Sequence, residues 1–264
     1  MAIIRCVHTG KYMSVIQFSH ANGFPAKTYS YLFNQLKEYK ISAINIIGDS
    51  TDYNNINWFD LSDELINNVL QHDEPVIGVG HSFGGVLTLL AAAKNPELFK
   101  NIVLLDPPIF APIKSTVIKI LRVLGIEDWV SPAGKSKKRR DNFASKSEAK
   151  SIFKSKKLFK NFHPQALNDY VTYGLNKNEN GVELTIPVLK ETAIFNKSLI
   201  LYPKKMRSVK GSLIYAAKNP ILWPSDLRWI NRNFYNLKLF PFPGSHFFPF
   251  DNPESTALMI KRCL

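Results

Sequence analysis

One short segment constrains the fold of this chain more than any other. An apolar run at 76–79 is followed by Gly-His-Ser-Phe-Gly-Gly at 80–85 and then by an Ala- and Leu-rich run at 86–93. This order predicts a buried strand, a sharp turn and a buried helix, because glycines two residues before and after Ser82 let strand and helix approach closely. A serine at such a tip projects into a cleft, and the Phe83 amide at the helix N-terminus becomes an oxyanion donor. The pentapeptide alone also fits a glycine-rich turn whose serine caps a helix.

The segments around this turn alternate between strand and helix patterns. Nearly continuous apolar runs are typical of strands buried on both faces, and apolar residues at helical spacing lie between them. Short connections in this order predict an α/β fold with a parallel, doubly wound sheet. The expected strands are 14–18, 41–47, 76–79, 102–105, 211–215 and 237–240, with early helices at 29–39 and 60–70.

The regular alternation stops after Asp106 and resumes near Gly211. We therefore expect a core made of residues 1–110 and 211–264, into which residues 111–210 are inserted. Apolar residues recur at helical spacing within the inserted part, so it is expected to form a helical cap over the sheet. Its expected helices are 113–124, 143–162, 164–175 and 188–202.

The inserted part carries the whole net charge. The chain has 34 Lys and Arg against 21 Asp and Glu, a net charge of +13, and residues 111–210 hold 21 of the basic and 8 of the acidic residues. A basic surface can attract an anionic substrate or lie transiently on an anionic membrane, and a simple solvated face is the alternative. Because no nucleic-acid-binding motif accompanies the charge, nucleic acid is not an expected partner.

Cysteine usage and the N-terminus predict the compartment. Cys6 and Cys263 stand at opposite ends of the chain, so neither a disulfide framework nor a metal site is expected. The N-terminus lacks the pattern of an export signal, and no apolar run is long enough to span a membrane. These features predict a cytoplasmic protein that works without a metal or another cofactor.

A nucleophilic serine needs a base, and His246 occupies the expected place among the six histidines. It follows the last expected strand, in a loop at 241–248 whose glycine and prolines can aim its side chain. A serine followed later in the chain by an acid and then by a histidine is the order of one type of catalytic triad. His246 is therefore the predicted base for Ser82.

These motifs together resemble the α/β-hydrolase superfamily, and particularly its bacterial hydrolases. The resemblance is carried by Ser-His-Ala-Asn-Gly-Phe-Pro at 19–25, the Gly-His-Ser-Phe-Gly-Gly segment and Leu-Asp-Pro at 105–107, and it covers residues 14–110 and 211–260. It implies the α/β-hydrolase fold, a mostly parallel twisted sheet flanked by helices, with a helical cap inserted after the strand that ends in Leu-Asp-Pro. It also implies a second oxyanion donor in the early loop, which falls on the amide of Phe24 to within a residue or two.

The acid of the triad is where this chain departs from the superfamily. Members commonly carry it in a Gly-x-x-Asp-Pro segment, and the matching segment here ends in Asn219-Pro220. An asparagine amide can orient a histidine, but it does not stabilise an imidazolium as a carboxylate does. Asp106 is therefore the predicted acid, because it ends the strand after the serine turn on the same sheet edge, and Pro107 stiffens the next turn. The alternative for Asp106 is a structural carboxylate that bonds backbone amides at the strand end. Asp226 remains an alternative, although it fits a helix cap better.

The predicted activity is hydrolysis of a carboxylic ester or thioester with a mainly apolar acyl group, through a Ser82, His246 and Asp106 triad and an acyl-enzyme. The same fold also supports a lyase, an acyltransferase or a carbon–carbon hydrolase. Asn219 keeps open a non-catalytic binding protein with an impaired triad. The residues expected to contact a small-molecule substrate are Asn22, His81, Phe110, Trp129, Trp223, Phe247 and Phe248.

Overall fold

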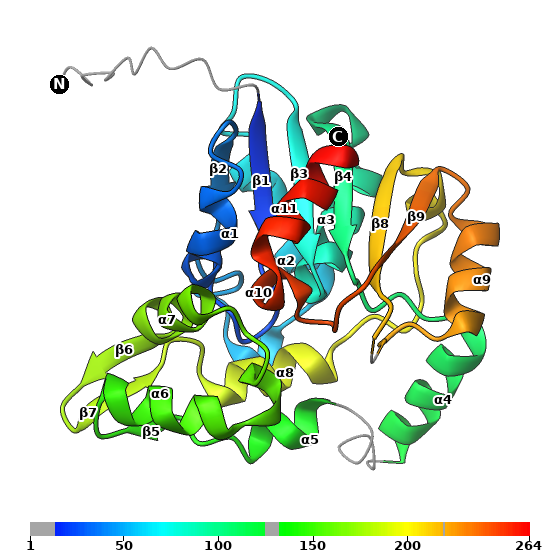
Figure 1. The fold of residues 1–264 in the computed structure, drawn as a ribbon. Helices are drawn as coiled ribbons and strands as arrows, with labels where there is room; N and C mark the ends of the chain where they lie inside the picture. Colours follow the sequence, from blue (N-terminus) through cyan, green and yellow to red (C-terminus); the bar gives the residue numbers. More distant parts are fainter. Residues whose placement is uncertain (1–13, 125–131, 219) are drawn as a thin grey trace, which may run out of the picture.

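A parallel six-stranded sheet forms the centre of the molecule (Figure 1). The computed structural model describes residues 14–124, 132–218 and 220–264. The strand order is β2-β1-β3-β4-β8-β9, and each neighbouring pair is parallel. The expected α/β fold is therefore confirmed. The strands are β1 (Val15–Ser19), β2 (Lys40–Ala43), β3 (Val76–His81), β4 (Phe99–Leu105), β8 (Gly211–Ala216) and β9 (Leu237–Phe242).

The strand expected at 41–47 is shorter than its sequence pattern suggests. β2 ends at Ala43, and the backbone carbonyl of Asn45 accepts from the Ala26 amide at 2.8 Å. The side chain of Asn45 accepts from the Lys27 amide at 3.1 Å. The chain therefore leaves the sheet early, because Asn45 holds the segment that follows β1 instead of continuing the ladder.

Helices cover both faces of the sheet and bury two apolar layers against it. Figure 1 shows α1, α10 and α11 on one side of the sheet and α2 and α3 on the other. Every residue of α3 from Phe83 to Ala92 is buried, as expected for a helix that is apolar on all sides. The helices of the core are α1 (Ser30–Asn34), α2 (Trp58–Val69), α3 (Phe83–Lys94), α9 (Pro224–Asn233), α10 (Phe248–Asp251) and α11 (Pro253–Arg262).

The segment between β4 and β8, which we call the insertion (residues 111–210), is mainly helical. In Figure 1 most of it lies at the end of the sheet where the strands β1 and β3 finish. Its aromatic residues join the same apolar cluster as Phe18 and Phe24 of the core. The elements of the insertion are α4 (Pro112–Val123), α5 (Pro132–Lys137), β5 (Asn142–Phe143), α6 (Lys146–Ser155), α7 (Pro164–Tyr173), β6 (Leu175–Asn178), β7 (Gly181–Leu184) and α8 (Val188–Asn196).

A small antiparallel sheet in the insertion was not expected from the sequence. Its order is β5-β7-β6, and residues 143–162 form a short strand and a shorter helix instead of one helix. Ser145 begins α6 by accepting from the Glu148 amide at 3.1 Å, which ends the strand and starts the helix. The β6–β7 hairpin alternates buried Val182 and Leu184 with exposed Glu183, a period of two that is too short to stand out in the sequence.

None of the helices in the described ranges has the length and the apolar character that crossing a membrane requires.

Candidate active site

Ser82 lies on a strained turn between β3 and α3. Its backbone has φ 53° and ψ −120°, a conformation that is costly for a residue with a side chain and that persists only where the surroundings enforce it. The surroundings here are tight, because a Cβ on Gly80 would lie 2.4 Å from the Gly84 carbonyl oxygen and a Cβ on Gly84 would lie 2.2 Å from that of Ser19. The turn therefore needs both glycines and holds the half-buried serine at its tip.

Asp106 follows β4 and has the same kind of strained backbone. With φ 45°, it is the second of two non-glycine residues with positive φ in the described part of the chain. Its amide donates to the Ile214 carbonyl at 2.7 Å, and its Oδ1 accepts from the Ala216 amide at 3.0 Å. Strand β8 thus fixes this fully buried carboxylate and leaves Oδ2 free to meet another group.

His246 joins the two strained residues. Its Nδ1 lies 2.7 Å from Asp106 Oδ2, and its Nε2 lies 3.1 Å from Ser82 Oγ. Because a carboxylate can only accept, Nδ1 carries the proton, and Nε2 is then the acceptor for the serine hydroxyl. The three predicted residues come together at the carboxyl edge of the sheet, in an arrangement that can move a proton from serine to histidine.

His81 was predicted to contact substrate, but it is fully buried and both of its ring nitrogens have protein partners. Its Nε2 donates to the His246 carbonyl at 3.0 Å, and its Nδ1 accepts from the Tyr29 hydroxyl at 2.7 Å. The Tyr29 oxygen in turn accepts from the Ala21 amide at 3.1 Å. Burial, aided by the nearby His246, holds the pKa of His81 well below 6.5, so the ring is neutral and serves as a support.

The amide of Phe24, predicted as the second oxyanion donor, is already used. It donates to the Ala21 carbonyl at 3.1 Å, and Gly23 has φ 80°, so residues 21–24 form a turn that requires positive φ at its third position. The candidate donors of this loop are therefore the amides of Asn22 and Gly23. The Phe83 amide is at the first position of α3, where an amide has no partner within the helix, and its oxyanion role stays a prediction.

The insertion contacts this loop, which we call the oxyanion loop (residues 21–24) after its predicted role. Asn22, predicted to contact substrate, donates its side-chain nitrogen to the Glu191 carbonyl at 2.8 Å. The Glu191 carboxylate lies so close to Gly23 that a Cβ there would be 3.0 Å from its Cδ. Arg139 pairs with Glu191 at 2.8 Å and donates to the Tyr170 hydroxyl. Burial raises the pKa of Glu191, and the Arg139 charge opposes this rise.

The predicted substrate-contacting aromatic residues separate into different places. The ring of Phe247 lies 5.0 Å from that of His246 and 5.4 Å from that of Phe24, so it borders the site. Phe248 is fully buried and stacks on Phe242 at 4.4 Å, which makes it a core residue and corrects its predicted role. Trp129 lies outside the described residues.

Phe110 and Trp223 belong to a separate cluster. Their rings lie 4.1 Å and 4.5 Å from the ammonium group of Lys114, and Trp223 is 57% exposed. In the described structure both residues therefore pack on a lysine, and neither has a ring contact with His246, so their predicted contact with substrate stays a prediction.

Asp226 is not the partner of His246. Its carboxylate accepts from the amides of Ala111 and Trp223, both at 2.8 Å, and lies 3.3 Å from Lys114. It therefore caps α9 and ties the start of the insertion to that helix. Asn219, the residue at the family's usual acid position, lies outside the described residues.

No cluster of three or more His, Cys, Asp or Glu side chains suited to a metal ion occurs within residues 14–124, 132–218 and 220–264. The supporting residues Tyr29, Arg139, Tyr170 and Glu191 were not predicted. No sequence motif marks them, since they meet only through the fold.

Comparisons with known proteins agree with this fold. A family model described as the alpha/beta hydrolase family matches residues 18–257. The Abhydrolase domain-containing protein ACTT2 of Alternaria alternata is 24% identical over 145 residues, which cover 55% of this chain and 48% of that protein. The monoglyceride lipase of Mus musculus is 34% identical over 67 residues, or 22% of each chain. This chain therefore matches about half of the first relative and about a fifth of the second.

Solved structures resemble the whole molecule. The thioesterase domain from the curacin biosynthetic pathway aligns with a TM-score of 0.76 and 16% identity, covering 96% of this chain and 93% of that chain. An M. tuberculosis esterase aligns with a TM-score of 0.69 and 15% identity, covering 96% and 86%. At such identities the likeness concerns the fold. Because the family model spans most of the sequence, this chain belongs to the alpha/beta hydrolase family.

Proposed function

We propose that this protein is a serine hydrolase that cleaves a carboxylic ester or thioester. The observation that carries the proposal is the hydrogen-bonded line from Ser82 Oγ to His246 at 3.1 Å and from His246 to Asp106 at 2.7 Å. A serine next to a histidine that a buried carboxylate orients is the arrangement that activates a hydroxyl for attack on an acyl carbon.

In the proposed reaction His246 Nε2 takes the proton of Ser82 as Oγ attacks the carbonyl carbon. The negative charge that develops on the carbonyl oxygen is held by the Phe83 amide and by an amide of the oxyanion loop. The tetrahedral intermediate then expels the alcohol or thiol, which takes the proton from the imidazolium. Water attacks the acyl-enzyme by the same route, releases the carboxylic acid and restores the serine.

Asp106 serves as the acid in this proposal in place of the missing aspartate at position 219. Its carboxylate stabilises the imidazolium that forms during attack, which an amide at position 219 would not do. We therefore favour a catalytic protein over the non-catalytic binding protein that Asn219 had kept open.

We also propose that the insertion is a cap whose aromatic residues form one wall of an acyl-binding site. Phe162 of the insertion lies 5.9 Å from Phe247 and 6.4 Å from Phe24, and such a wall suits an apolar acyl group. We place ester or thioester cleavage ahead of the lyase, acyltransferase and carbon–carbon hydrolase alternatives because one relative, 34% identical over 67 residues, is a lipase.

The test is covalent labelling by a fluorophosphonate together with hydrolysis of p-nitrophenyl esters. The wild-type protein should be labelled on Ser82 and should release nitrophenol, and Ser82→Ala should lose both while keeping the thermal unfolding midpoint of the wild type. Folded wild-type protein that takes up no label and hydrolyses none of a series of esters and thioesters would contradict the proposal.

A further inference from the structure

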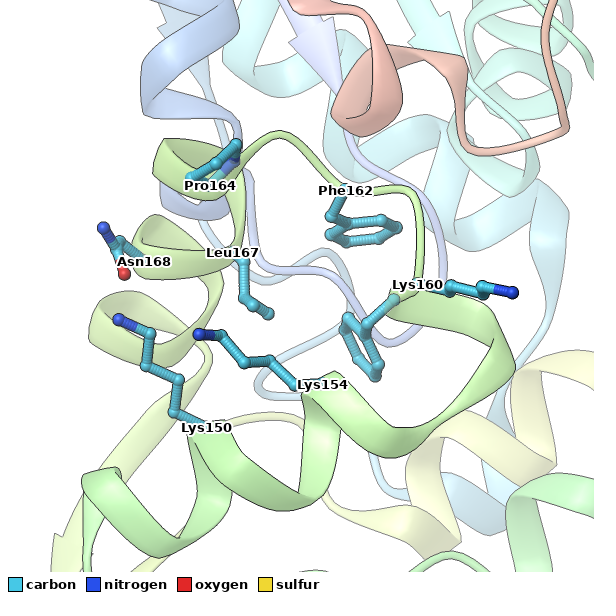
Figure 2. A pocket seen from close by; sticks show the side chains of 8 residues that line it. Lys150, Lys154, Lys160, Phe162, Pro164, Leu167 and Asn168 are labelled. Carbon is cyan, nitrogen blue, oxygen red and sulfur yellow. The ribbon is translucent and has the colours of Figure 1, made fainter.

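A hollow of about 370 Å³ lies between α6 and α7 of the insertion. Its walls are mainly apolar, with Phe159, Phe162, Pro164 and Leu167 beside the polar Asn168. Its rim carries Lys150, Lys154 and Lys160. Figure 2 shows Leu167 and Phe162 pointing into the space, while Lys150 and Lys154 extend in the same direction and Lys160 extends away from them. A volume of this order is in the range of small-molecule sites.

The three lysines at the rim carry uncompensated charge. In the described part of the chain the ammonium group of none of them forms an ion pair or a hydrogen bond with another residue. Lys150 and Lys154 stand one turn apart on α6, where like charges repel and destabilise the helix. An anion placed between them would relieve that repulsion.

The acidic residues of the two helices are occupied elsewhere. Glu148 of α6 pairs with Arg140 at 2.9 Å and accepts from the Ala144 amide at 2.6 Å. Asp169 of α7 accepts from the Tyr31 amide at 2.8 Å and from the Gln165 side chain at 2.9 Å. The hollow therefore has a positive rim without a carboxylate among its lining residues.

Phe162 connects the hollow with the candidate active site. Its ring lines the hollow and stacks on Phe250 at 4.9 Å. It also lies 5.9 Å from Phe247, whose ring is 5.0 Å from His246. Packed aromatic rings thus link the hollow with the proposed base, and Phe162 is the side chain that both places share.

We propose that this hollow binds the anionic end of the substrate, which would be an amphiphilic ester or thioester bearing a carboxylate or a phosphate. The apolar segment of such a molecule lies along Phe162 and Phe247, and its charged group meets Lys150 and Lys154. This inference rests on the proposed hydrolase function and adds to it the chemical class of the substrate. It also assigns two of the basic residues of the insertion to binding an anionic group.

The kinetic test compares matched pairs of substrates. p-Nitrophenyl monoesters of succinate, adipate and sebacate carry a free carboxylate, and their methyl diester counterparts are neutral. The wild type should prefer one of the charged esters, and K150Q/K154Q should lower kcat/KM for that ester roughly five- to tenfold, the loss expected from two partly exposed ion pairs. The neutral counterpart should be hydrolysed as before.

The matched control is K156Q/K157Q, which removes the same charge from exposed residues that follow α6 but do not line the hollow. It should leave the preference for the charged ester unchanged. An equal loss in both double variants would mean general attraction by a basic surface, and no loss in either would mean a solvated lysine face. Both results would overturn the proposal.

Direct binding separates this inference from the proposed hydrolase function. Calorimetry on the Ser82→Ala protein with hexanoate and hexyl phosphate should detect binding that K150Q/K154Q weakens, whatever the wild type hydrolyses, and the stronger ligand identifies carboxylate or phosphate. No binding by either ligand would refute the hollow as an anion site. Loss of binding to phosphatidylserine vesicles in K150Q/K154Q, with the ester preference intact, would assign the lysines to a membrane surface and overturn the proposal.

Discussion

The two sides of the candidate active site are held by different parts of the molecule. Ser82, Asp106 and His246 sit at strand ends, where adjoining strands fix the first two in strained backbone conformations. The oxyanion loop on the other side is held by the insertion, through Glu191 and its partner Arg139. The sheet side depends on short connections of the core, and the loop side on a buried ion pair. Substitutions on the two sides should therefore differ in the size of their effect and in the quantity that they change.

The largest effect is expected on the sheet side. Asp106→Asn removes the negative charge beside His246 and should lower kcat by about 10⁴-fold, as in other triads that lose their carboxylate. Steady-state kinetics with a p-nitrophenyl ester, together with the thermal midpoint, checks this. The matched controls are Asn219→Ala and Asp226→Asn, and a loss of similar size in either would assign the acid elsewhere.

Acid should weaken the fold through His20, which lies beside the oxyanion loop. Burial, only partly offset by a hydrogen bond to Ala21, lowers the pKa of His20 from 6.5 to about 4. Between these two values the unfolded chain binds a proton that the folded one does not, so stability falls as pH drops from 6.5 and levels off below 4, by about 3 kcal/mol.

Urea unfolding between pH 8 and pH 4 measures this loss. His20→Asn should reduce the slope of the curve between pH 6.5 and 4, where the buried His81, whose pKa also lies well below 6.5, keeps contributing. The matched change at the partly exposed His163 should leave the slope as in the wild type. The same slope in wild type and His20→Asn would contradict the assignment.

On the loop side, Glu191→Gln should slow the reaction without unfolding the protein. The variant leaves Arg139 without its carboxylate partner and loosens the loop. The kcat and the fluorophosphonate labelling rate should therefore fall about tenfold to hundredfold, where the upper figure is the loss of rate caused by removing one oxyanion donor. KM for a neutral ester should change little. Glu183→Gln, an exposed position on β7, is the control, and a purely structural role would lower the thermal midpoint and leave the labelling rate of the folded fraction unchanged.

The smallest effects concern the aromatic residues. Phe247→Ala should raise KM for an aromatic or long-chain ester roughly fivefold, equivalent to about 1 kcal/mol of lost contact. Trp223→Ala should stay within about twofold, because Trp223 packs on Lys114 and not beside His246. The reverse order would place the acyl site near α9.

Patterns local in sequence predicted the sheet and the residues at its edge. Apolar runs and the glycines around Ser82 depend on near neighbours, and Asp106 and His246 follow from strand order. The sequence could not show that the Phe24 amide donates within a turn or that the His81 side chain is buried. Both depend on where Ala21 and Tyr29 lie in space.

Contacts between distant residues could not be predicted from one sequence. Arg139 and Glu191 are 52 positions apart and have no motif, so their pairing behind the oxyanion loop comes only from the packing of the insertion. The hairpin at β6 and β7 was missed for a different reason, since its strands are only four residues long. The lysines around the hollow were visible only as part of a basic segment.

The buried line from Ala21 through Tyr29 and His81 to the His246 carbonyl spans both sides of the site. This line of hydrogen bonds fixes the distance between the oxyanion loop and the loop that carries His246, so neither loop moves without the other. Because burial holds the pKa of His81 well below 6.5, its ring stays neutral and this spacing does not change around neutral pH. Tyr29→Phe would therefore remove the hydrogen bonds that tie the two loops together. The oxyanion loop would then be positioned mainly by its contacts with the insertion, and the His246 loop would lose its fixed distance from it.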